Sequence, residues 1–274
     1  FFNPRAGVSY TLAERNNFYL SFAVAQKEPT RSDFTDRYMF AEANTYPSSE
    51  KLYDWELGYQ YTAPRLSLGV NLYYMKYKDQ LVPTGMVNDD SNALNTNVPD
   101  SYRRGVELSA SWRATGWFTV GANATFSQNR IENYVDALKD SPTYGKELGD
   151  MTIAYSPDVI ANAFLNFHHR GFEAVFHTQH VGKQYFTNNE NDALSLDAYC
   201  VTNLNLAYTF RTRSARSVRL GLLINNLFNA EYESNGYGYS YMDTWSGPAP
   251  VRIDEAYYFP QAPLNVLANV TVKF

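Results

Sequence analysis

The sequence has little cysteine and histidine, and it contains no long apolar run. Cys200 is the single cysteine among 274 residues, so an intrachain disulfide is excluded and the redox compartment is left open. No stretch of about 18 apolar residues occurs, and the sequence therefore predicts no transmembrane helix. The opening residues FFNPRAGVSY lack the charged start and apolar block of a signal peptide, which indicates either a chain that is not exported or a part of a longer product.

An excess of positive charge is also missing. Lys and Arg number 23 against 28 Asp and Glu, which gives a net charge of -5, and no basic patch favours nucleic-acid binding. Aromatic residues, in contrast, are abundant: 23 Tyr and 17 Phe accompany a mean hydropathy of only -0.43. Many aromatics in a polar chain are typical of a structure that presents alternate residues to an apolar medium and to water.

Period-two alternation of apolar and polar residues predicts eleven strands, whereas no convincing amphipathic helix is found. In LYDWELGYQY, for example, Trp55 and Leu57 share one face and Asp54 and Glu56 share the other. The predicted strands are Arg5–Ala13, Phe18–Gln26, Lys51–Thr62, Leu66–Lys78, Tyr102–Ala114, Trp117–Arg130, Val159–His169, Phe172–Gln184, Ala198–Phe210, Val218–Phe228 and Leu264–Phe274.

The connections between these strands alternate between short and long. The short ones are 14–17, 63–65, 115–116, 170–171 and 211–217, and the long ones are 27–50, 79–101, 131–158, 185–197 and 229–263. A β-sandwich also has alternating strands, but it has no reason to sort its loops by length. The pattern favours an all-β fold, a transmembrane antiparallel up-and-down β-barrel of the bacterial outer membrane, with residues 1–274 in one barrel domain.

Strand parity predicts that this barrel is incomplete. Long loops lie outside and short turns lie in the periplasm, so the first and the last of eleven strands both run downward. A bacterial barrel normally has an even number of strands, and an open sheet would leave two unpaired edges in lipid. We therefore expect at least one further strand upstream.

Several motifs, in order along the chain, carry a family resemblance. AQKEPTRSDF, YPSSEKLYDWELGYQY, VPDSYRRGVELSASW, RLGLLINNLFNAEY with SNGY, and the closing YFPQAPLNVLANVTVKF together resemble the C-terminal half of the barrel of TonB-dependent outer-membrane transporters. The resemblance implies the second half of a 22-stranded barrel that is plugged by an N-terminal domain, with plug and first strands outside this chain. It implies no enzyme activity and no cofactor.

The resemblance also implies a function and partners. We expect TonB-dependent active import of a scarce ligand, a ferric siderophore or similar metal chelate, with cobalamin, glycan or peptide import and a passive porin-like or adhesin-like barrel as alternatives. Expected partners are outer-membrane lipid and lipopolysaccharide, the TonB energy-transducing complex acting through the plug, the chelate itself and a surface lipoprotein. Haem is disfavoured, because residues 28–50 contain no histidine and Lys27-Glu28 stands where the family has Arg-Ala.

The stretch YESNGYGYSYMDTWSGPAPVRIDEAYY is the main candidate for ligand binding. Its aromatic faces and hydroxyl groups suit a binding surface, and its arginine suits an anionic group. The candidate residues are Tyr237, Tyr239, Tyr241, Trp245 and Arg252. The alternative interpretation is that these aromatics belong to the outer girdle or pack the loops together.

Phe274 is the second candidate. Outer-membrane barrels commonly end in an aromatic residue that their assembly machinery recognises, so the resemblance implies an insertion signal. The simpler interpretation, a last lipid contact, is compatible with it.

Other charged and metal-ligating side chains carry weaker signals. His177 and His180 have helical metal-ligand spacing but face opposite sides of a strand, whereas His168 and His177 are both expected to point inward on adjacent strands. We predict no metal site. The group Arg31, Asp33, Asp36 and Arg37 is interpreted as a salt-bridged loop framework, and the pair Asp89 and Asp90 is too small to indicate a calcium site.

Overall fold

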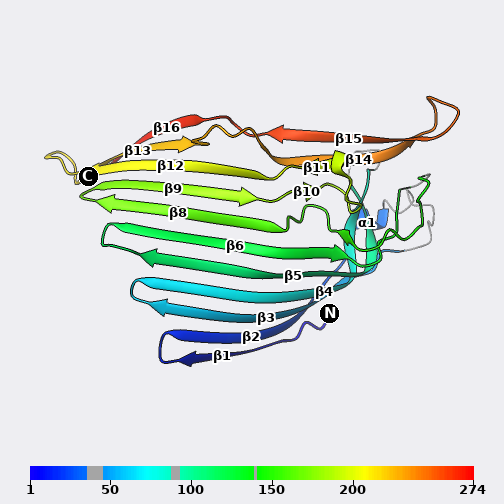
Figure 1. The fold of residues 1–274 in the computed structure, drawn as a ribbon, viewed down its shortest axis with the longest axis horizontal. Helices are drawn as coiled ribbons and strands as arrows, with labels where there is room; N and C mark the ends of the chain where they lie inside the picture. The colour runs from blue at the N-terminus through cyan, green and yellow to red at the C-terminus, as the bar shows by residue number, and fades with distance from the viewer. Residues whose placement is uncertain (36–45, 88–92, 139–140) are drawn as a thin grey trace.

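The computed structural model describes residues 1–35, 46–87, 93–138 and 141–274 (Figure 1). Eleven antiparallel strands form a meander in which each strand pairs with the next. They are β1 (Arg5–Leu12), β2 (Asn16–Lys27), β3 (Glu50–Ala63), β4 (Leu66–Val87), β5 (Ala93–Arg113), β6 (Phe118–Ile131), β8 (Val159–His169), β9 (Phe172–Val181), β12 (Tyr199–Phe210), β13 (Ser217–Asn225) and β16 (Asn265–Lys273). The eleven predicted strands are confirmed.

Shorter elements lie in the connections. They are α1 (Arg31–Thr35), β7 (Met151–Thr152), β10 (Gln184–Tyr185), the 3-10 turn η2 (Asp192–Leu194), β11 (Ser195–Leu196), β14 (Glu233–Asp243) and β15 (Val251–Pro260). In the described part of the chain, no helix is long and apolar enough to cross a membrane.

Short turns gather at one end of the sheet and the long connections at the other (Figure 1). The turn between β8 and β9 shows why two residues suffice. Arg170 and Gly171 have φ angles of 48° and 87°, the left-handed pair of a tight hairpin turn. A Cβ atom on Gly171 would lie 2.3 Å from the carbonyl oxygen of Thr209, so the neighbouring strand also requires glycine here.

In the middle of the sheet the two faces differ in polarity. One row across β2 to β6 is apolar: Leu20, Leu57, Leu72, Val106 and Phe126. The row one position along each strand is polar: Ser21, Glu56, Tyr73, Gly105 and Ser127. The first face is suited to lipid and the second to an aqueous barrel interior.

The structure corrects the prediction that residues 79–101 form a loop. Strands β4 and β5 continue through most of this segment as a paired ladder, from Gln80 opposite Val98 to Val87 opposite Ala93. Pro83 and Pro99 weigh against a strand in the sequence, because proline cannot donate to a ladder. The hairpin is held instead by a small apolar core in which Val82, Val98, Ile131, Tyr134 and Ile153 are buried.

A second correction concerns residues 229–263, which were also predicted to form a loop. Strands β14 and β15 pair over this segment as a separate two-stranded sheet. The hairpin lies at the end of the molecule where the long connections gather, beyond β13 and β16 (Figure 1). It carries the residues from which we expected ligand binding.

Candidate functional site

The β14–β15 hairpin has a docking face that is built from small residues. A Cβ atom on Gly236 would lie 2.7 Å from the Phe186 ring, and one on Gly238 would lie 2.9 Å from both Phe186 and Leu194. Phe186, Leu194 and Leu196 are buried and form the core beneath the hairpin. Glycine is required on this face because the hairpin backbone lies directly against these side chains.

The opposite face carries a ladder of exposed aromatic rings. Tyr237 stacks on Tyr257 across the two strands, with ring centroids 4.9 Å apart and an interplanar angle of 13°. Tyr239 continues the ladder, 6.3 Å from both Tyr257 and Tyr241. Tyr237 and Tyr257 remain 46% and 43% exposed, so both rings are accessible from solvent.

One carboxylate organises the hydroxyl groups of this ladder. Tyr239 and Tyr257 donate hydrogen bonds to Glu255 Oε2 at 2.7 and 2.8 Å, and Tyr241 donates to Oε1 at 3.1 Å. The Tyr239 hydroxyl, followed by those of Tyr257 and Tyr241, holds the pKa of Glu255 below its ordinary value. The same hydrogen bond to Glu255 raises the pKa of Tyr239. The surface therefore presents one carboxylate that accepts hydrogen bonds from three phenol groups.

Arg252 lies on the docking side of the hairpin rather than among the tyrosines. Its Nε donates to Asp254 Oδ1 at 2.9 Å, and its Nη2 donates to Ser240 Oγ at 3.0 Å. Asp254 also accepts a hydrogen bond from Asn191 at 2.8 Å, which ties the hairpin to the residue that caps η2. The positive charge of Arg252 is thus paired with the carboxylate of Asp254.

Trp245 lies in the turn between β14 and β15, where its side chain is 84% exposed. Its backbone amide donates to Asp243 Oδ1 at 2.9 Å, and that of Ser246 donates to the same oxygen at 3.1 Å. The structure therefore brings Tyr237, Tyr239 and Tyr241 together and leaves Trp245 at the tip.

Sequence reasoning missed Glu255 and Tyr257, which complete the tyrosine face. The sequence gives no clear signal for them, because the face of β15 that carries Ile253, Glu255 and Tyr257 mixes apolar and polar side chains, and so does its other face.

Arg31 and Asp33 both lie in α1, and the carboxylate of Asp33 accepts several hydrogen bonds. Asp33 Oδ2 accepts from the backbone amide and the hydroxyl of Thr30, both at 2.6 Å, and Oδ1 accepts from Asn95 at 2.9 Å. These contacts tie α1 to β5 through hydrogen bonds, and the salt-bridged framework stays a prediction. Asp36, Arg37, Asp89 and Asp90 lie outside the described residues.

The histidines do not converge on one point. His168 is paired with Glu173 and His177 with Phe164, so the two histidines lie four positions apart along their ladder, roughly 13 Å. In the described residues, no group of three or more His, Cys, Asp or Glu side chains is arranged to hold a metal ion.

A family model described as the β-barrel of TonB-dependent receptor-like proteins matches residues 1–227. The chain belongs to this family. TonB-dependent receptor barrels lie in the bacterial outer membrane and are transporters rather than enzymes. The apolar and polar faces of the meander are therefore the lipid and interior faces of an outer-membrane barrel.

Solved structures of the family share this fold at low sequence identity. The ferric yersiniabactin uptake receptor FyuA from Yersinia pestis aligns with a TM-score of 0.67 at 19% identity, over 98% of this chain and 37% of that one. The copper transporter OprC aligns with a TM-score of 0.69 at 18% identity, over 98% and 39%. The ferric citrate transporter FecA aligns with a TM-score of 0.67 at 16% identity, over 98% of this chain and 37% of that one. The TonB-dependent receptor chain thus spans little more than a third of their lengths.

Proposed function

We propose that this chain is part of a transporter that imports a metal chelate, a ferric siderophore or a compound of similar chemistry, across the outer membrane with energy supplied through TonB. The tyrosine face of β14–β15 is the observation that carries the proposal of a ligand surface. It offers stacked rings, three hydroxyl groups and one carboxylate on an external hairpin. Exposed tyrosines supply large contact area at low entropic cost.

The charge of this face narrows the class of ligand that we propose. The donor hydrogens of Tyr239, Tyr241 and Tyr257 are directed to Glu255, so the face offers acceptors and a negative charge outward. A neutral or cationic chelate with N–H or O–H donors fits it better than a highly anionic one. We also propose ligand contacts outside this face, at Trp245 on the tip and at Arg252 on the docking side. Arg252 would contact an anionic group of the ligand.

We further propose that strands outside this chain close the barrel around a plug. β1 pairs only with β2 and β16 only with β13 among the described strands, and unpaired edges of this kind are not viable in lipid. The plug and its contact with TonB belong to the same proposal. We also propose that Phe274, which is 93% exposed directly after β16, is read by the assembly machinery.

A binding assay on the full-length protein tests the imported ligand. Ferric complexes of a neutral hydroxamate, an anionic catecholate and citrate are titrated in detergent, and uptake of the bound chelate is then compared in cells with and without TonB. We expect the neutral complex to bind tightest and its uptake to require TonB. Conductance through planar bilayers without any binding would support a passive pore, and selective binding of a corrinoid, glycan or peptide would replace the siderophore proposal.

A matched pair of variants locates the binding surface. Tyr237→Ala removes one stacked ring, and we expect the affinity for the bound chelate to fall about tenfold, which corresponds to roughly 1.4 kcal/mol. Tyr144→Ala removes a tyrosine of similar exposure, 42%, from another external connection, and we expect little change. Equal losses in both variants would contradict the proposed surface.

A further inference from the structure

The lipid-facing side of β2 to β6 changes in steps toward the external end. The apolar row that contains Leu57 is followed by an aromatic row and then by charged rows. In paired order the next three rows are Phe22, Trp55, Tyr74, Arg104 and Gln128; then Val24, Tyr53, Lys76, Tyr102 and Arg130; then Gln26, Lys51, Lys78 and Asp100. Strand register therefore places several cations on the membrane side, directly beyond the apolar band.

A continuous line of aromatic rings marks the edge of that band. The Phe22 and Trp55 centroids lie 5.2 Å apart, those of Trp55 and Tyr74 5.8 Å, and those of Tyr74 and Tyr102 6.3 Å. Aromatic rows of this kind lie at the level of the lipid headgroups. The cations beside these rings are thus at headgroup depth.

Two of these cations are held over aromatic rings and have no carboxylate partner among the described residues. Lys51 Nζ lies 5.0 Å from the centroid of Tyr53, and Arg104 Cζ lies 5.1 Å from that of Tyr102. The hydrogen bonds of Arg104, from Nε at 2.8 Å and from Nη2 at 2.5 Å, go to the neutral amide oxygen of Gln128. A ring face orients a cation without neutralising it.

The surrounding ion pairs leave this patch positive. Lys76 and Lys78 share Asp100, with Nζ–O distances of 2.9 and 2.5 Å, and Lys76 also contacts Glu132 at 2.5 Å. Arg130 is paired with Glu190 and adds no free charge. Lys51, Lys76, Lys78 and Arg104 thus face two carboxylates, whereas the chain as a whole carries a charge of -5.

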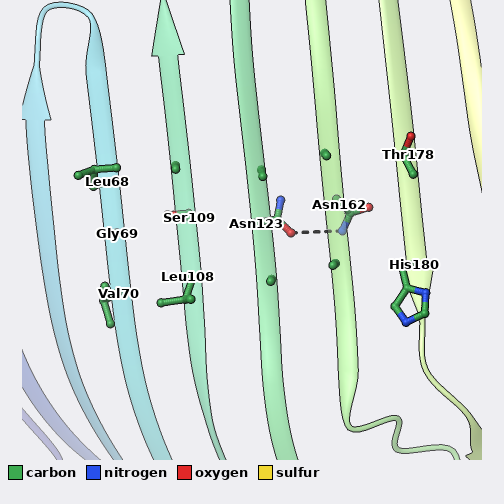
Figure 2. Close-up of a pocket in the computed structure, with 14 residues that line it drawn as sticks. Leu68, Gly69, Val70, Leu108, Ser109, Asn123, Asn162, Thr178 and His180 are labelled. Carbon is green, nitrogen blue, oxygen red and sulfur yellow. Dashed lines mark hydrogen bonds between the residues drawn. The ribbon is translucent and has the colours of Figure 1, made fainter. Parts of the chain in front are cut away.

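An apolar groove of about 490 Å³ lies deeper on the same face. Leu68, Val70 and Leu108 border it on one side and Thr178 and His180 on the other (Figure 2). Its floor between them is formed by alanines, which are Ala110, Ala122, Ala124, Ala161 and Ala163. Leu108 follows Arg104 by four positions on β5, so the groove begins roughly 13 Å below the cation, toward the membrane centre.

We propose that Lys51 and Arg104 bind the phosphate groups of a phosphorylated, acylated lipid of the outer leaflet, and that one acyl chain of this lipid lies in the alanine groove. Arginine recognises phosphate through parallel hydrogen bonds, and basic clusters at headgroup depth are the usual means of selecting anionic lipids. The groove accepts the chain because alanine side chains leave room that leucine would fill. The proposal rests on the outer-membrane location of the family and is independent of the imported ligand.

The test compares two forms of one lipid on the full-length protein in detergent. Bis-phosphorylated lipid A and its dephosphorylated form are titrated, and the bound fraction is read by native mass spectrometry. The variant K51Q/R104Q is expected to bind the phosphorylated lipid at least about tenfold more weakly than wild type, and both proteins should bind the dephosphorylated lipid equally. The matched variant R211Q/R213Q removes two exposed cations from the β12–β13 turn at the opposite end and should stay within about twofold of wild type.

Two results would overturn the proposal: equal affinity of the wild type for both lipids, or equal losses in the two double variants. A heat-modifiability gel confirms that each variant is a folded barrel. If K51Q/R104Q fails to fold, a salt titration of the wild type decides. Raising NaCl from about 0.05 to about 0.5 M should weaken binding of the phosphorylated lipid alone, because added salt screens exposed charges. An unchanged affinity across that range would exclude the phosphate contact.

Discussion

Phe186 offers the sharpest perturbation of the external hairpin. Its side chain is only 2% exposed and lies beneath Gly236 and Gly238, with ring contacts to Tyr155 and Tyr258 whose centroids are both 5.8 Å away. Replacing it with alanine would remove the side chain on which the β14–β15 backbone rests. The strands of the main sheet keep their own ladders, so we expect the effect to be confined to the hairpin.

The size of this effect follows from the buried volume that is lost. A Phe→Ala change in a packed core costs about 3–5 kcal/mol. A free-energy change of about 1.4 kcal/mol is a factor of ten in an equilibrium constant. Phe186→Ala should therefore raise the equilibrium constant for opening of the hairpin roughly a hundredfold to a few thousandfold. A shift of that size exceeds the error of hydrogen-exchange measurements.

Hydrogen exchange with mass spectrometry on the full-length protein measures this opening directly. Peptides covering residues 233–260 should lose protection in Phe186→Ala, and peptides from β3 and β4 should not. Phe228→Ala serves as the control, because Phe228 is 76% exposed and its loss leaves no cavity. Unchanged exchange over residues 233–260, or the same increase in the control, would refute the proposed docking.

Three further predictions concern single positions. Glu255→Gln should lower the pH at which tyrosinate absorbance appears. In the wild type, the pKa of Glu255 is depressed because the folded hairpin favours the ionised carboxylate. Protection of the hairpin should therefore hold above pH 4.5, the ordinary pKa of glutamate, and decline below it. Gly171→Val should destabilise the β8–β9 turn by about 1–3 kcal/mol, measured as a lower urea midpoint than that of Gly116→Val, a glycine with open space around its Cβ position. Phe274→Ser should reduce the amount of inserted barrel in membrane fractions while the inserted fraction keeps its Tm; equal insertion would contradict the assembly role.

The main sheet was predictable because each membrane strand has one apolar and one polar face. Strand Val159–His169 was predicted with both ends correct, and most other ends agree within about three residues. The loop-length pattern added the orientation, since a barrel that crosses a membrane needs short turns on one side only.

The external elements were not predictable in the same way. Beyond the membrane, strands need no uniform apolar face, and the β4–β5 extension is stabilised by the distant Tyr134 and Ile153 rather than by its own pattern. In β14, glycine is a weak strand former, and its use became visible only with Phe186 in place beneath it.

The candidate site shows the same limit. The sequence identified Tyr237, Tyr239 and Tyr241 by composition, and the structure adds Glu255 as the common acceptor of Tyr239, Tyr241 and Tyr257. Glu255 lies 16 positions from Tyr239 and 14 from Tyr241 along the chain, and it becomes their partner only through cross-strand register, which places Tyr239 opposite Glu255.

The two faces of β14–β15 have a consequence for how this receptor can diversify. Odd-numbered positions of β14 face the surroundings, whereas its glycines at 236 and 238 anchor the ribbon to its support. Since neighbouring residues on a strand lie on opposite faces, mutations that alter the exposed face need not touch the residues that hold the hairpin in place. Alternate positions of this segment can therefore change while the residues between them keep the hairpin docked.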